Sequence, residues 1–299
     1  MNKEVSVIET LLRRKWIIAA GLLPALALYT VFSIYPIMSS VYYSFFKWDG
    51  FSPKVWHGLS NYSNLVADPI FWRSILNNFY FVLFSVFLEI PIGLYLALML
   101  SGKLFKRSGI FKTVFFMPVV ISTIVISLIW NMFYNYQIGL INTALRAFGL
   151  ESWTQNWLGN PHLAIFLLCI VVVWQYTGLY MVIFLAALQN VPDEILEAAE
   201  LDGAVGVKRT WSIIVPMIID TIFASIVLCI SGALRAFDLV YVMTAGGPNH
   251  MTEVGATYMF SQTFNSMKYG YGSAISTAII VISLILILVS QLLVRVLRR

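Results

Sequence analysis

Long apolar stretches recur along the chain, and the short segments between them hold most of the charged residues. A helix needs about 20 apolar residues to cross the hydrocarbon core of a bilayer, because each residue adds ~1.5 Å. Backbone groups in lipid must be paired internally, and the alternation expected of barrel strands is absent. The pattern therefore predicts an all-α polytopic membrane protein with six transmembrane helices, roughly at 16–42, 74–101, 111–135, 162–190, 212–236 and 273–296.

The composition supports a membrane protein. Of the 299 residues, 60% are hydrophobic and 11% are charged, whereas soluble proteins have about 45–50% and about 25%. The first apolar stretch follows basic residues as in a signal peptide, but it continues past Tyr35 without a small-residue cleavage site, so we expect a retained span. Both cysteines, Cys169 and Cys229, lie in apolar stretches and are expected to be buried and unpaired.

The lysines and arginines indicate an orientation. With the N-terminus in the cytoplasm, the inside segments hold 13 of the 19 basic residues, as the positive-inside rule requires. An even number of spans then places both termini in the cytoplasm. The net charge of +5 follows from this topology and gives no support to a nucleic-acid partner. The basic residues left outside or near the outer surface are Lys47, Lys54, Arg73, Arg146, Arg235 and Lys268.

One inside loop breaks the basic pattern. Five of the fourteen acidic residues fall between 193 and 202. Pro192 suits the first turn of a helix, and Gly203 permits the positive φ that ends one. The predicted helix has an acidic side, interrupted by Leu201, and an apolar side. Two interpretations remain open, a solvated amphipathic loop or a helix-turn-helix that inserts into a groove of a partner. The acidic side holds Asp193, Glu194, Glu197 and Glu200; the apolar side holds Ile195, Leu196, Ala198 and Ala199.

The order of motifs along the chain resembles a known family. Residues 197–203 read Glu-Ala-Ala-Glu-Leu-Asp-Gly and are followed by Ile213 and Pro216. This segment resembles the EAA motif of the permeases of binding-protein-dependent ABC importers. The flanks resemble the carbohydrate-uptake branch, which includes maltose and multiple-sugar permeases. Asp220 stands where that family often has a second proline. Further matching segments are 185–192, 237–248 and 269–274, with Asn61, Tyr62, Phe71, Trp72, Asn77, Pro118, Trp130, Gly139 and Asn142.

The resemblance implies a mechanism and a set of partners. Such a permease is a multi-pass protein of the plasma (inner) membrane of a prokaryote. It pairs there with a second homologous permease. Two ATPase subunits bind ATP and Mg and grip the EAA loops, while an extracellular or periplasmic binding protein delivers a carbohydrate. The chain then divides into a cytoplasmic segment 1–15 and a transmembrane permease domain 16–299, with a coupling loop at 191–211. The resemblance assigns ATPase coupling to Glu197, Ala198, Ala199, Asp202 and Gly203.

The chain has no sequence signature of its own enzymatic chemistry. It lacks the phosphate loop Gly-x-x-x-x-Gly-Lys-Ser/Thr, and it has no His-Glu-x-x-His or Gly-x-Ser-x-Gly. We therefore expect no enzyme activity, cofactor or metal site in this chain, and we interpret His57, His162 and His250 as loop residues. Two alternatives stay open: a secondary transporter driven by an ion gradient, and a permease of the same family for a solute such as a polyol phosphate.

Aromatic and polar residues inside the spans are candidates for a substrate pathway, because sugars stack on rings and hydrogen-bond to amides and hydroxyls. Helix packing is the alternative interpretation of the aromatic cluster. Glu89 is expected to make a structural hydrogen bond or to act in gating, and Arg235 could pair with Asp238. The small residues Gly178, Ser225 and Gly232 are expected at close helix contacts. The pathway candidates are Trp174, Gln175, Tyr176, Tyr180, Asn131, Ser231 and Arg235.

Overall fold

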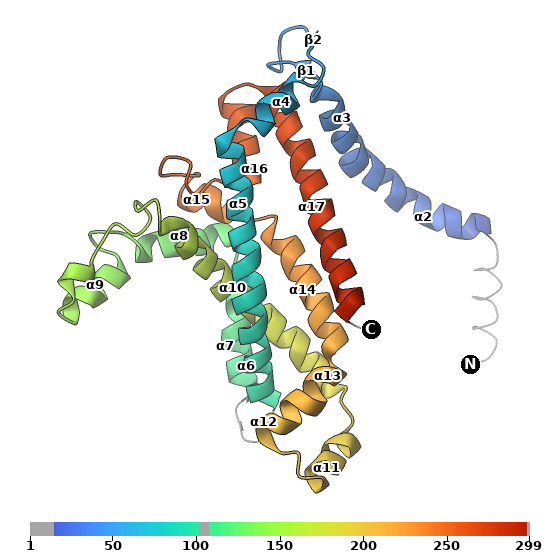
Figure 1. Cartoon of the computed structure of the whole chain (residues 1–299), viewed down its shortest axis with the longest axis vertical. Helices are drawn as coiled ribbons and strands as arrows, with labels where there is room; N and C mark the ends of the chain where they lie inside the picture. The colour runs from blue at the N-terminus through green and yellow to red at the C-terminus, as the bar shows by residue number, and fades with distance from the viewer. Residues whose placement is uncertain (1–14, 102–107, 298–299) are drawn as a thin grey trace. The chain divides into compact units, whose positions relative to one another are not determined.

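The computed structural model describes residues 15–101 and 108–297. The predicted cytoplasmic segment 1–15, apart from Lys15, lies outside the described residues, as do the basic residues Lys103, Lys106, Arg107, Arg298 and Arg299. The elements of Figure 1 are α2 (Lys15–Tyr29), η1 (Thr30–Ile34), α3 (Tyr35–Tyr43), β1 (Phe46–Lys47), β2 (Val55–Trp56), α4 (Ser60–Val66), α5 (Pro69–Phe84), η2 (Ser85–Glu89), α6 (Ile90–Ser101), α7 (Ser108–Val120), α8 (Thr123–Phe133), α9 (Leu140–Ala147), η3 (Glu151–Trp153), α10 (Ala164–Gln189), α11 (Asp193–Leu201), α12 (Gly206–Arg209), η4 (Thr210–Ile214), α13 (Val215–Met217), α14 (Ile219–Ala233), α15 (Asp238–Met243), α16 (Gly255–Phe260), η5 (Ser261–Asn265) and α17 (Tyr269–Leu297).

The chain is mostly helical, which confirms the all-α class; the two strands form one antiparallel pair of two residues each. Four of the six predicted spans are continuous helices of sufficient length and apolarity: Ala19–Tyr43, Pro69–Ser101, Ala164–Gln189 and Tyr269–Leu292. The other two are helix pairs, Gly109–Val120 with Thr123–Phe133, bent by 98°, and Gly206–Met217 with Ile219–Ala233, bent by 71°. Within the described residues there are thus four such helices, or up to six spans if each bent pair counts as one.

The two bends have local causes that the hydropathy pattern does not reveal. Ser122, between α7 and α8, is extended at φ −54° and ψ 135°, and Pro118 lies inside α7. The second bend lies at Ile218, at φ −102° and ψ 10°, just after Pro216. Asp220, the departure from the family pattern, occupies the first turn of α14, where the positive end of the helix dipole favours an acid.

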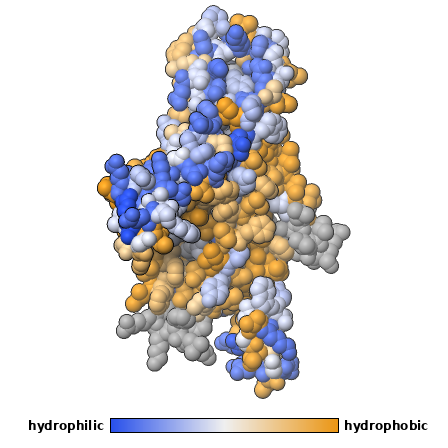
Figure 2. Space-filling view, turned by 60° about the vertical axis from the view of Figure 1, so that its left-hand side comes forward, coloured by the Kyte–Doolittle hydropathy of each residue, from blue (hydrophilic) through white to orange (hydrophobic). Residues whose placement is uncertain are grey.

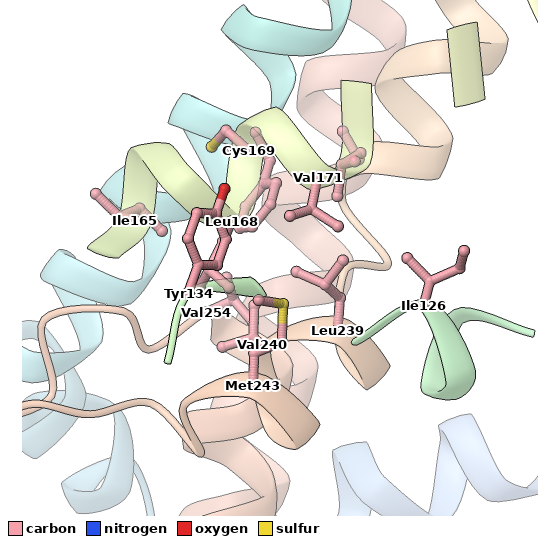
Figure 3. Close-up of a cluster of buried hydrophobic side chains, with 13 residues drawn as sticks. Ile126, Tyr134, Ile165, Leu168, Cys169, Val171, Leu239, Val240, Met243 and Val254 are labelled. Atoms are coloured by element: carbon pink, nitrogen blue, oxygen red, sulfur yellow. The ribbon is translucent and has the colours of Figure 1, made fainter. Parts of the chain in front are cut away.

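The structure divides into two compact units, one within residues 1–65 and 262–278 and the other within 66–261 and 279–299. In the second unit, α10 packs against α5, α6, α7 and α14. One cluster of buried side chains, which includes Leu168, Val240 and Met243, surrounds the first half of α10 (Figure 3). A second cluster, with Met181 and Phe184, surrounds its other half. Both cysteines are buried and unpaired, as expected.

Within this second unit, α11 and α12 project from one end, and α15 and α16 lie toward the other (Figure 1). Hydrophobic residues cover much of the middle of the face seen in Figure 2, while hydrophilic and hydrophobic residues are intermixed on the α11–α12 projection. This distribution suits helices that cross lipid and a loop that stands outside it.

Gly178 fulfils the expected close helix contact. A Cβ placed there would collide with the carbonyl oxygen of Phe115 in α7. Because that neighbour is backbone, it cannot rotate away. We expect Gly178→Leu to lower the stability of the detergent-solubilised protein by at least the ~1–3 kcal/mol typical of overpacking, measured by thermal unfolding. Gly109→Leu, at a position with open space around its Cβ, is the matched control and should leave the unfolding temperature unchanged.

Candidate functional site

The acidic loop, residues 191–211, contains the helix that its sequence predicts. Pro192 is extended and α11 begins directly after it, with Asp193 and Glu194 in its first turn. The helix ends where Gly203 adopts a φ of +73°. The Gly203 amide donates to Glu200 O at 3.1 Å, and the Ala204 amide donates to Ala199 O at 2.8 Å. These two bonds form a Schellman motif, which fixes the direction in which the chain leaves α11.

The burial of the side chains in this loop does not follow the predicted acidic and apolar faces. Ala199 is buried and Ala198 is exposed, so of the two alanines only Ala198 offers surface to another molecule. Glu200 faces back toward α12 and lies 3.9 Å from Arg209, an exposed pair that contributes little to stability. Glu197 is exposed and has no ion pair within the described part of the chain. Its carboxylate is therefore free for an external cation.

Exposed apolar side chains lie beside the acids of this loop. Of these, the sequence pattern predicts the exposure of Leu201 alone. Leu201 is 90% exposed and Val207 is 76% exposed. Val205 and Trp211 are exposed as well. A helical wheel over residues 193–201 does not include Val205, Val207 and Trp211. Gly203 and Gly206, both at positive φ, turn the chain after α11 and separate these residues from it. Exposed apolar groups rimmed by polar residues mark contact sites with other molecules.

A cavity of about 280 Å³ lies inside the second unit and reaches η2, α8, α10, α14 and α15. Three predicted pathway residues line it: Tyr176, Tyr180 and Arg235. Glu89 also lines it, although its side chain is only 3% exposed, and Ser85 in the same π-helical turn hydrogen-bonds to its carboxyl. π-helical turns often occur at functional sites. The cavity thus presents aromatic, hydroxyl, carboxyl and guanidinium groups to one volume.

The other four pathway candidates do not line this cavity. Gln175 is buried and donates from Nε2 to Thr123 Oγ1 at 3.2 Å. Trp174 packs edge-on against Trp130, with ring centroids 5.6 Å apart. Asn131 Nδ2 donates to Val242 O at 3.2 Å. Ser231 Oγ donates to its own helix at Val227 O, 2.9 Å away.

Arg235 and Asp238 form no ion pair, although both line the cavity. The expected pairing assumed a continuous helix, whereas α14 ends at Ala233 and a turn precedes α15. Gly232 also departs from expectation. Nothing lies within 4 Å of a Cβ placed there, and the residue lines the cavity rather than a helix contact.

A buried polar clamp joins α5 to the segment before α16. Asn77 is 1% exposed, and its Nδ2 donates to the carbonyls of Met251 at 2.8 Å and Glu253 at 2.7 Å. Glu253 is 3% exposed and accepts from Thr257 Oγ1 at 2.5 Å. His250, interpreted as a loop residue, has its Nδ1 3.1 Å from the Glu253 carboxylate. Sequence reasoning missed Glu253, because a single acid in a loop gives no signal of burial.

Asn77→Leu should loosen this loop. The substitution leaves two carbonyl oxygens without their donor, which costs about 1–3 kcal/mol for a buried group. Hydrogen exchange measured by mass spectrometry should show faster exchange over residues 246–257 and an unchanged rate in α10. Asn190→Leu is the control, because the Asn190 side chain donates to Ala186 O in its own helix. Equal exchange in the two variants would contradict the clamp.

Comparisons with known proteins agree with this arrangement. Residues 89–299 match the family described as binding-protein-dependent transport system inner membrane component. The chain is 38% identical over 272 residues to "Probable ABC transporter permease protein YurN" of Bacillus subtilis (strain 168), covering 90% of this chain and 93% of the relative. It is 36% identical over 265 residues to the trehalose/maltose transport system permease protein MalF of Thermococcus litoralis, covering 88% of each.

A solved structure shares the fold. A chain in the crystal structure of a bacterial ABC transporter involved in the import of the acidic polysaccharide alginate superposes with a TM-score of 0.84 at 21% identity. The match covers 98% of this chain and 99% of that chain. The family match spans more than half of the sequence, and relatives above 30% identity span about nine-tenths of it. The chain belongs to the family of binding-protein-dependent transport system inner membrane components.

Proposed function

We propose that this multi-pass inner-membrane protein is the permease subunit of an ATP-driven ABC importer for a sugar or oligosaccharide. The observation that carries the proposal is the exposed acidic loop on a protein of long apolar helices. Its Glu197 forms no ion pair within the described residues. The relatives support the carbohydrate, since their names include transport systems for trehalose/maltose and for lactose.

The partners follow from the same proposal. A second homologous permease completes the pathway, two ATPase subunits bind ATP and Mg, and an extracellular or periplasmic binding protein delivers the solute. The acidic loop and both termini lie in the cytoplasm. The loop is part of a permease domain that spans residues 16–299. Movement of the ATPases acts on Glu197, Ala198, Asp202 and the Gly203 turn. Ala199 acts indirectly, because it is buried within the loop.

We assign the substrate pathway to the cavity. Tyr176 and Tyr180 offer ring faces and hydroxyls, while Glu89 and Arg235 offer hydrogen bonds to sugar hydroxyls. Gln175 then supports the wall through its bond to Thr123, which lines the cavity, while Trp174, Asn131 and Ser231 do not touch the solute.

Reconstitution tests the function. The chain purified alone should hydrolyse no ATP, and with its ATPase, second permease and binding protein it should import labelled sugar only when ATP is supplied. Uptake by the chain alone under a proton or sodium gradient would establish a secondary transporter instead. A panel of binding-protein ligands that includes sugars and a polyol phosphate then decides between these solutes.

A further inference from the structure

We propose that the segment Phe46–Trp56, here called the aromatic hairpin, lies in the lipid headgroup layer of the membrane. Its exposed apolar side chains insert among the lipids, and the ammonium of Lys54 faces lipid phosphate. The proposal rests only on the chain spanning the membrane, and its test uses no transport assay, so it can fail without affecting the proposed function.

The hairpin is attached to the ends of two predicted spans, all within the first compact unit. The helix α3 ends at Tyr43, and β1 begins at Phe46. Near the start of α17, the Gly270 amide donates to Trp48 O at 3.1 Å. A Cβ at Gly270 would collide with Phe46 O, so the hairpin backbone lies directly against the first turn of α17. Because α3 and α17 both leave the hydrocarbon here, the hairpin is held at headgroup depth.

Three large apolar side chains of the hairpin are exposed to the same degree as its polar residues Lys47, Asp49, Ser52 and Lys54. Phe51 is 83% exposed, Trp56 67% and Val55 61%. Leu59, just beyond the hairpin, is 68% exposed. Contiguous exposed apolar groups mark contacts with proteins or membranes. Continuity with the two span ends favours the membrane.

Lys54 provides a positive charge on the hairpin that an anion can approach. Its Nζ lies 4.9 Å from the ring centroid of Tyr43, and it makes no ion pair within the described residues. Rings rather than a carboxylate therefore hold the ammonium, and its charge stays available to an anion. The other rings within 6 Å of Nζ are those of Tyr42, Phe46 and Trp48.

The hairpin's own acid does not compete for this lysine. Hydrogen bonds from Ser52, by side chain and backbone, and from the Phe51 amide lower the pKa of Asp49 to about 2. Asp49 is thus ionised but engaged by its own turn. Aromatic and lysine side chains of this kind are enriched where a protein meets the membrane surface, and anionic headgroups attract lysines placed there.

Spin labels test the depth of the hairpin. The full-length protein carrying Phe51→Cys is labelled and reconstituted into bilayers of phosphatidylcholine and phosphatidylglycerol. Ser152→Cys, in another exposed loop, is the control, and the buried native cysteines define the background. The accessibility ratio of oxygen to a nickel chelate should be several-fold higher at residue 51 than at residue 152. Equal ratios would overturn the proposal, as would a label at residue 51 that is aqueous until the binding protein is added.

A second comparison tests Lys54. Lys54→Gln should lower the ratio at residue 51 in bilayers with phosphatidylglycerol and leave it unchanged in pure phosphatidylcholine. Lys47→Gln removes the same charge from β1 and should change the ratio less, because no ring of the described residues lies over Lys47. Equal effects of the two substitutions, or an equal change in both bilayers, would overturn the role of Lys54.

Discussion

Replacing Glu197 by lysine should abolish ATP-driven uptake while leaving the permease folded and inserted. Glu197 is exposed and forms no ion pair within the described residues, so the fold does not depend on its charge. In the assembled complex, we expect its carboxylate to pair with an arginine of the ATPase. Loss of one partner from such a pair costs about 2–5 kcal/mol, and a reversed charge adds repulsion.

Three measurements separate this effect from misfolding: thermal unfolding of the permease, co-purification of the ATPase, and uptake by the complex. Glu151→Lys, the same reversal in an exposed loop away from α11, should leave all three unchanged. Conversion of the ATPase arginine to glutamate should restore uptake to the Glu197→Lys complex. Normal transport by Glu197→Lys would remove the acidic loop from the coupling mechanism.

The start and end of α11 could be predicted because local chemistry determines them. An extended proline, acids in the first turn and a glycine at positive φ act within a few residues of one another. The membrane spans could also be predicted from the sequence, because a span is recognised by its length and apolarity alone. The bends at Ser122 and Ile218 could not be predicted in this way, because hydropathy averaged along a window is the same for a straight and a broken helix.

The cavity shows where sequence reasoning stops. The helix α10 is apolar all round, so its sequence does not tell which side faces the interior. Tyr176 and Tyr180, four residues apart, share the cavity side. Gln175 and Trp174 lie beside them in the sequence but do not line the cavity: Gln175 bonds to the lining residue Thr123, and Trp174 packs against Trp130. The packing of α5, α6, α7 and α14 around α10 decides which residues face the cavity, and most of these contacts are distant in the sequence.

Gly232→Phe should block uptake without unfolding the protein. Gly232 lines the cavity and has open space at its Cβ position, so the ring enters the cavity rather than a helix contact. A solute forced to share that volume meets a cost of about 1–3 kcal/mol, as in overpacking, which corresponds to roughly 5–150-fold in rate. Uptake of labelled sugar by the reconstituted complex measures this change, and thermal unfolding shows whether the fold is intact.

Gly109→Phe, at a glycine that also has open space but lies outside the cavity, should transport normally, and Gly232→Leu should give a smaller block than Gly232→Phe. Wild-type uptake by the folded Gly232→Phe complex would show that the solute passes elsewhere. The comparison with Gly178 completes the argument, because both glycines lie in apolar spans. A side chain at Gly178 meets backbone and should cost stability, whereas a side chain at Gly232 meets empty volume and should cost transport.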